Sequence, residues 1–74
     1  MEKKIRLNQG ETYITLGQFL KFAGLIQTGG EAKHFLNEAT IFVNGELESR
    51  RGRKLHVGDK ILINDQDSFS IIGS

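Results

Sequence analysis

The 74-residue sequence predicts an α+β fold in which two short helices pack on a small, mainly antiparallel sheet. Two segments place apolar residues at the i, i+3, i+4, i+7 spacing of one helical face. Around them lie short segments in which apolar and polar residues alternate, as they do along strands. Asn44-Gly45 sits between two such segments and is the strongest short signal for a hairpin.

The first alternating segment, residues 3–7, predicts a strand at the edge of the sheet. The first helix is expected to follow residues 15–18, which read Thr-Leu-Gly-Gln and have the form of a capping box. Gly24 suits the position just beyond its end. The apolar face of this helix consists of Leu16, Phe19, Leu20 and Ala23. The next residues, Leu25 and Ile26, are expected to fill the core between the helices.

The second helix is expected to start at residues 28–31, which read Thr-Gly-Gly-Glu. In this capping box the Thr28 hydroxyl and the Glu31 carboxylate would each accept a backbone N–H. The apolar face of the second helix consists of Ala32, Phe35, Leu36 and Ala39. The pattern then alternates over residues 41–43, turns at Asn44-Gly45, and predicts a return strand over residues 46–48.

The rest of the chain predicts further strands. Residues 50–54 read Arg-Arg-Gly-Arg-Lys and form a basic loop, after which residues 54–57 alternate. A Gly58-Asp59 turn leads to a strand over residues 60–63, and a polar turn leads to a last strand over residues 68–72. The first and last strands can pair, which would tie down both ends of the domain.

The composition indicates one globular domain with 38% hydrophobic and 26% charged residues. The absence of Cys excludes a disulfide framework and a thiolate metal site. No apolar run approaches the roughly 18 residues of a membrane span, and no signal peptide is visible, so a cytoplasmic protein is expected.

The positive charge is concentrated although the net charge is only +1. Residues 50–60 contain five basic residues and a single acid, Asp59. This distribution favours a local anionic partner, and the planar donor fork of Arg suits phosphate oxygens. On the polar face of the second helix, Lys33 and Asn37 are i, i+4 neighbours and His34 flanks them. If the loop folds beside this face, the two form one basic groove, which Lys21 could extend.

Other interpretations of these residues stay open. The basic loop could be an ordinary solvated charge run. The helix start at Thr28-Gly29-Gly30 could hold a phosphate or serve as a cap alone. A zinc site needs four ligands and the chain has two His and no Cys, and no nucleophile lies near a base, so neither a metal cofactor nor an enzyme is expected.

Three segments together resemble a known family. They read Thr-Gly-Gly-Glu-Ala-Lys-His-Phe-Leu at residues 28–36, Ile-Phe-Val-Asn-Gly at residues 41–45 and Val-Gly-Asp-Lys-Ile at residues 57–61. Their order and spacing resemble the RNA-binding domain named after ribosomal small-subunit protein S-four, over about residues 15–63. The resemblance is to small, stand-alone bacterial members of that family. It implies the fold known as the alpha-L motif and binding of structured RNA through the second helix and the adjoining loop.

We therefore predict a single RNA-binding domain over residues 1–74 that binds ribosomal or transfer RNA without catalysis, cofactor or membrane. The expected contacts are Thr28, Gly29, Gly30, Lys33, His34, Asn37, Arg50, Arg51, Arg53 and Lys54. The alternative is a protein-interaction adaptor whose basic loop docks on an acidic surface of a ribosomal protein or a larger enzyme. RNA recognition would rest on shape, because few groups that read bases are evident.

Overall fold

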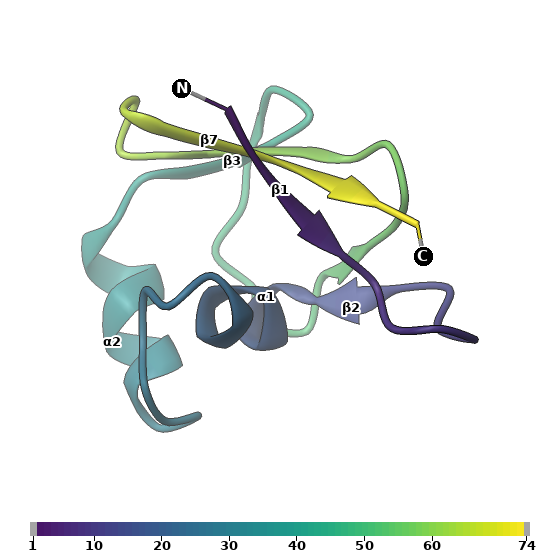
Figure 1. Ribbon diagram of the computed structural model, residues 1–74. Coiled ribbons are helices and arrows are strands. Elements are labelled where there is room, and N and C mark those ends of the chain that lie inside the picture. Colours follow the sequence, from purple (N-terminus) through teal and green to yellow (C-terminus); the bar gives the residue numbers. More distant parts are fainter. Residues whose placement is uncertain (1, 74) are drawn as a thin grey trace.

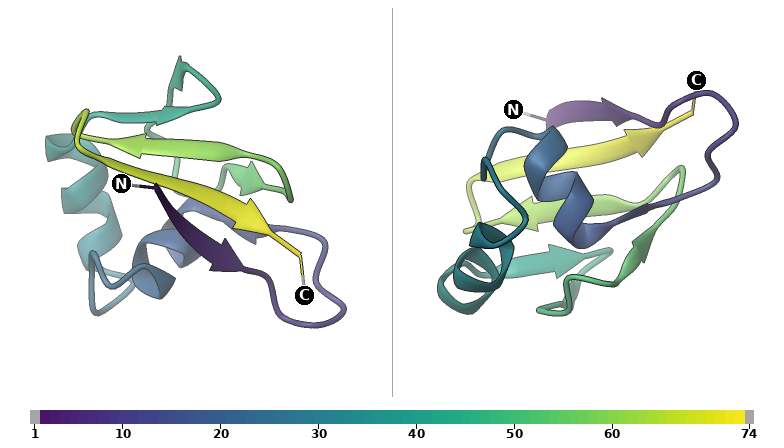
Figure 2. Two further views of the ribbon diagram at one scale, coloured as in Figure 1. Left: turned by 45° about the horizontal axis from the view of Figure 1, so that its top comes forward. Right: turned by 90° about the horizontal axis from the view of Figure 1, so that it is seen from below.

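A five-stranded sheet forms one layer of the protein and two helices form most of the other (Figure 1). The computed structural model describes residues 2–73. The strands stand in the order β1 (Glu2–Arg6), β7 (Asp67–Ile72), β6 (Lys60–Ile63), β3 (Ile41–Val43) and β4 (Glu46–Leu47). The helices are α1 (Leu16–Phe22) and α2 (Glu31–Glu38). Both lie on the same face of the sheet, as the view from below in Figure 2 shows, so the predicted α+β class is confirmed.

The first and last strands pair, as the sequence predicts. Strands β1 and β7 run parallel, with Glu2 opposite Ser68 and Arg6 opposite Ile72. The other neighbours in the sheet, β7 with β6, β6 with β3 and β3 with β4, are antiparallel. The pairing of β1 with β7 holds both ends of the described chain in the sheet.

A second, two-stranded ribbon joins β2 (Ile14–Thr15) to β5 (Lys54–Leu55) in antiparallel register. Sequence reasoning did not predict it. The ribbon lies beside α1 on the helix side of the sheet (Figure 1). Its contacts continue into the basic loop, where Gly17 N–H donates to the Arg51 carbonyl at 2.9 Å. A Cβ atom on Gly17 would lie 3.4 Å from the Arg51 Cβ, so the loop backbone packs closely against the start of α1.

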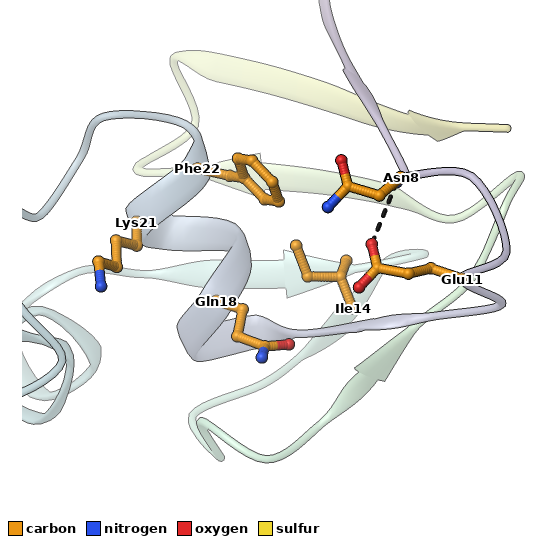
Figure 3. A pocket seen from close by; sticks show the side chains of 6 residues that line it. All are labelled: Asn8, Glu11, Ile14, Gln18, Lys21 and Phe22. Atoms are coloured by element: carbon orange, nitrogen blue, oxygen red, sulfur yellow. Dashed lines mark hydrogen bonds between the residues drawn. The ribbon is translucent and has the colours of Figure 1, made fainter. Parts of the chain in front are cut away.

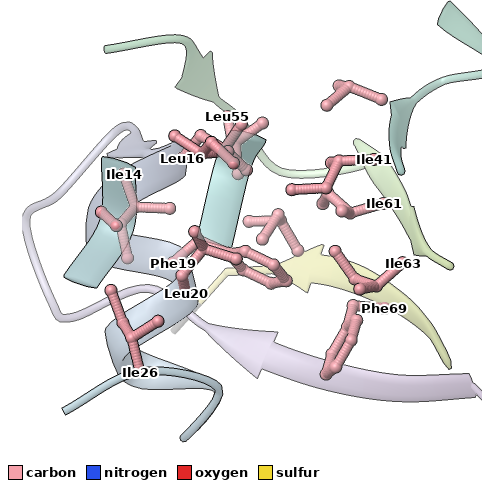
Figure 4. Packing of buried hydrophobic residues seen from close by; sticks show 14 of the residues in the cluster. Ile14, Leu16, Phe19, Leu20, Ile26, Ile41, Leu55, Ile61, Ile63 and Phe69 are labelled. Atoms are coloured by element: carbon pink, nitrogen blue, oxygen red, sulfur yellow. The ribbon is translucent and has the colours of Figure 1, made fainter. Parts of the chain in front are cut away.

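The core lies between the sheet and the helices (Figure 4). Phe19 of α1 and Phe69 of β7 meet edge to face, with ring centroids 5.1 Å apart and an angle of 87° between their planes. Ile26 is buried, which confirms its predicted place between the helices. The remaining core positions agree with the predicted apolar faces and include Leu16, Leu20, Ala32, Leu36, Ile41, Val43, Ile61, Ile63 and Ile71.

The capping box of the first helix is confirmed. Thr15 Oγ1 accepts the Gln18 N–H at 3.3 Å, and Gln18 Oε1 accepts the Thr15 N–H at 3.1 Å. The helix ends at Phe22 with Ala23 as its C-cap, and Gly24 follows with a φ of 77°, which an L side chain rarely adopts. These caps fix where α1 begins and ends.

The capping box predicted for the second helix is wrong. The helix begins at Glu31 with Gly30 as its N-cap, and no side chain caps it. The Thr28 hydroxyl instead donates to the Glu31 carboxylate at 3.4 Å. Backbone carbonyls, rather than side chains, accept the first N–H groups of the helix. The Glu31 N–H donates to the Thr28 carbonyl, and the N–H of the next residue, Ala32, donates to the Gly29 carbonyl. Gly30 already has helical φ and ψ values of −67° and −24°, so the chain turns before α2 begins and these backbone bonds can form.

The predicted hairpin at Asn44-Gly45 is confirmed, with φ values of 53° and 85°. The Asn44 side chain also joins the hairpin to the next turn. Its amide donates to Asp59 Oδ1 at 3.0 Å, and its carbonyl oxygen accepts the Lys60 N–H at 2.9 Å. Burial raises the pKa of Asp59, but hydrogen bonds from His56 N–H and from Asn44 outweigh it and lower the pKa overall. Two turns that are distant in sequence are thereby held together.

The alternating pattern after the basic loop does not continue as a strand to residue 57. Strand β5 ends at Leu55, and Val57 is exposed. His56 N–H donates to Asp59 Oδ2 at 2.7 Å, and Gly58 adopts a φ of 96°. This turn bends the chain away from the ribbon before Val57 can pack inward. Within residues 2–73, no helix has the length and apolar character needed to cross a membrane.

Candidate nucleic-acid interface

The basic loop is built around a buried carboxylate that sequence reasoning missed. Glu48 directly follows β4 and is among the buried residues. Its carboxylate accepts hydrogen bonds from Arg50 Nε at 3.1 Å and from Arg53 Nη1 at 2.8 Å. It also accepts the backbone N–H groups of Ser49 and Arg50, each at 3.1 Å. Glu48 therefore joins Arg50 near the start of the loop to Arg53 near its end.

These contacts keep the Glu48 carboxylate ionised. The hydrogen bond from the Arg50 side chain is the largest influence, and those from the Arg50 backbone and from Arg53 add to it. Together they outweigh burial and lower the pKa of Glu48 to about 2. The Arg50 side chain is still 76% exposed, whereas that of Arg53 is 29% exposed. The Arg53 side chain is thus mostly covered, whereas that of Arg50 faces solvent.

Arg51 lies outside this cluster and faces the second helix. Together with Ser49 it lines one side of a cavity of about 340 Å³, whose other side comes from Lys33, Leu36 and Asn37 of α2. We call this cavity the Lys33–Arg51 groove. Among residues 2–73, no carboxylate lies within ion-pair distance of Lys33 or Arg51. The predicted approach of the basic loop to the polar face of α2 is therefore present in the structure.

Other residues of the predicted site lie outside this groove. Thr28, Gly29 and Gly30 form the exposed turn before α2, and His34 is exposed on the helix itself. Lys54 belongs to the ribbon, where its Nζ lies 5.0 Å from the centroid of the Tyr13 ring. Of the ten predicted residues, the groove brings together Lys33, Asn37 and Arg51, and the other seven are not part of its lining.

Lys21, which could have extended the basic groove, lines a different cavity of about 360 Å³ (Figure 3). This cavity lies between α1 and the segment that joins β1 to β2. Its wall is partly apolar, with Ile14 and the 54% exposed Phe22 on one side. At its rim, Asn8 N–H donates to the Glu11 carboxylate at 3.1 Å. The positive charge of Lys21 is thus separate from that of the groove.

The described part of the chain contains no group of three His, Cys, Asp or Glu side chains that could hold a metal ion. His56 lies beside Asp59, with 3.9 Å between His56 Nδ1 and Asp59 Oδ2, and both belong to the turn after β5. The Lys33–Arg51 groove itself offers charged and polar donors, which are the groups that bind an anion.

Comparison with known proteins gives two findings that span most of the chain. The family model described as S4 domain matches residues 4–72, a longer stretch than the 15–63 of the predicted resemblance. A protein of Bacillus subtilis (strain 168) is 56% identical over 59 residues, which are 80% of this chain and 83% of that protein. That relative carries the name "Probable ribosome maturation protein RlbA".

Proposed function

The chain belongs to the S4 domain family, and from that membership we propose that it binds structured RNA without catalysing a reaction. The name of the Bacillus subtilis relative favours ribosomal RNA over transfer RNA and a part in ribosome maturation. The same proposal puts the protein in the cytoplasm, with ribosomal particles as its partners. The structural observation that carries the proposal is the Lys33–Arg51 groove.

The groove offers donors that suit an RNA backbone. The Arg51 guanidinium can form two parallel hydrogen bonds to one phosphate, and Lys33 adds a compact positive charge. Asn37 and Ser49 line the same groove and can hydrogen-bond to phosphate or to a ribose 2′-hydroxyl. Such contacts recognise the path of the backbone, so specificity rests on the shape of the folded RNA.

Glu48 supports this role by positioning the loop. It holds Arg50 through Nε and Nη2 and Arg53 through Nη1. We propose that Arg53 serves mainly to fix the loop, because most of its side chain is covered. Arg50 is exposed and keeps its Nη1 available for a phosphate. On this proposal Lys33 and Arg51 are the main contacts, while Arg50 and Lys54 are flanking ones.

Replacing Arg51 by Ala is expected to weaken binding to every structured RNA to a similar degree, because a phosphate contact carries no sequence information. If the wild-type protein neutralises about four phosphates, log K falls against log[salt] with a slope of magnitude about 3. In the variant the magnitude of that slope is expected to be smaller by about one. Labelled ribosomal RNA fragments titrated at several salt concentrations, with transfer RNA and duplex DNA as competitors, measure both quantities.

Arg6→Ala is the matched control. It removes the same side chain from an exposed position on β1, at the sheet edge opposite β4, and is expected to leave the slope unchanged. Equal effects of the two substitutions would indicate that only net charge matters and would contradict a specific groove. Weak, non-competing RNA binding by the wild type, together with an Arg51 effect on a protein partner, would favour the adaptor instead.

A further inference from the structure

An exposed aromatic side chain lies beside the basic loop. Tyr13 directly precedes β2 and is 41% exposed. The Lys54 Nζ lies 5.0 Å from its ring centroid, and the His56 ring centroid lies 6.1 Å away at an angle of 48°. The ribbon register pairs Ile14 with Leu55, so Tyr13 stands opposite His56, and alternation puts both on the ribbon face that carries Lys54.

This ribbon face is separate from the core. Ile14 and Leu55 point inward and are buried, whereas the alternate positions carry Tyr13, Lys54 and His56. The ribbon is also continuous with the basic loop, because Arg53 directly precedes β5 and its carbonyl accepts the Leu16 N–H at 2.8 Å. An aromatic ring with a cation over it therefore stands at the downstream end of the loop whose upstream part lines the Lys33–Arg51 groove.

We propose that Tyr13 is a stacking platform for an unpaired base of the bound RNA, an inference that rests on the RNA-binding function proposed above. Every base has a π-face, so stacking on an aromatic ring is favourable and tolerant of sequence. In the free protein the Lys54 ammonium occupies the ring through a cation–π contact. When a base takes its place, Lys54 is released to pair with a neighbouring phosphate, and His56 borders the same site.

The competing explanation is a purely structural one, in which Tyr13 and Lys54 stabilise the ribbon and touch no RNA. The two explanations differ in what a substitution changes. A platform changes the affinity for RNA that contains unpaired bases. A structural pair changes the thermal stability of the ribbon and leaves affinity unchanged when the protein is folded.

Intrinsic fluorescence tests the platform without any substitution. The chain contains one Tyr and no Trp, so its tyrosine emission comes from Tyr13 alone. An RNA hairpin with an unpaired purine loop is expected to quench this emission in a saturable way, with the same midpoint as binding of the labelled hairpin. A fully paired duplex of the same stem sequence is expected to bind through its backbone with much less quenching.

Substitutions give the second measurement. Tyr13→Ala is expected to weaken hairpin binding roughly 5- to 150-fold, the range for loss of one stacked base. Tyr13→Phe, which keeps the ring, is expected to bind like the wild type. Phe22→Ala is the matched control, because it removes another exposed aromatic that lines the separate cavity near Lys21. It is expected to leave hairpin affinity unchanged.

The outcomes distinguish failure of the Tyr13 stacking proposal from failure of the proposed RNA binding. Hairpin binding without quenching, or with equal affinity in Tyr13→Ala, would overturn the platform while the Arg51 salt effect still supported RNA binding. Absence of hairpin binding and of quenching in the wild type would overturn both. If thermal melting shows that Tyr13→Ala does not fold, the quenching of the wild-type protein alone decides whether Tyr13 stacks on a base.

Discussion

Replacing Phe19 by Ala is expected to lower the free energy of unfolding by about 3–5 kcal/mol. The side chain is fully buried, and its ring packs edge to face on Phe69, so the substitution removes a large apolar contact between helix and sheet. A loss of this size is comparable to the whole stability that one small core can supply. Urea denaturation followed by circular dichroism measures it.

Phe22→Ala provides the control on the same helix. The side chain is 54% exposed and one turn away from Phe19. Its loss is expected to change the free energy of unfolding by less than about 1 kcal/mol, because about half of the residue is already exposed to water in the folded protein. Similar losses for the two variants would mean that α1 does not present its predicted face to the sheet, and the arrangement of the core would be wrong.

Replacing Glu48 by Gln is expected to destabilise the protein by about 1–3 kcal/mol at pH 7. Gln cannot accept the same charge-assisted hydrogen bonds, and the Arg50 and Arg53 guanidinium groups lose the anion between them. Shape and size are nearly unchanged, so the effect reports on charge. Chemical denaturation of both proteins gives the difference in free energy of unfolding.

The dependence of this difference on pH has a defined sign. The folded-state pKa of Glu48 is about 2, below its ordinary value of 4.5, so the unfolded state binds the proton more readily. The stabilisation by Glu48 is therefore complete above pH 4.5 and is lost as the pH falls toward 2. The wild type is expected to approach the Gln variant over this window. A difference that stays constant with pH would show that the Glu48 charge does not stabilise the fold.

Local sequence patterns predicted most of the fold correctly because they act over a few residues. The apolar spacing in α1 and α2 assigned the inward faces, and the Asn44-Gly45 pair assigned the hairpin from the φ values that its turn demands. The cap at Thr28 was predicted wrongly for a reason that is also local. The backbone is already helical at Gly30, and the carbonyls of Thr28 and Gly29 accept the first N–H groups of the helix in place of a side-chain cap.

The finer structure of the candidate site depends on contacts that no short pattern contains. The local pattern of the loop does not distinguish its basic residues, and it predicts all four of them as phosphate contacts. Folding buries Glu48 and pairs it with Arg50 and Arg53, which leaves Arg51 to face α2. The ribbon of β2 and β5 joins residues that are far apart in sequence, and strands of two residues have too little alternation to be recognised.

Mapping of backbone amide chemical shifts during titration with a ribosomal RNA fragment tests the central claim most directly. The claim is that RNA lies in the Lys33–Arg51 groove. We expect the largest shift changes at Lys33, Asn37, Ser49 and Arg51, with the changes reduced by added salt. Largest changes on the opposite face of the sheet, around Phe42 of β3 and Leu62 of β6, would contradict the claim.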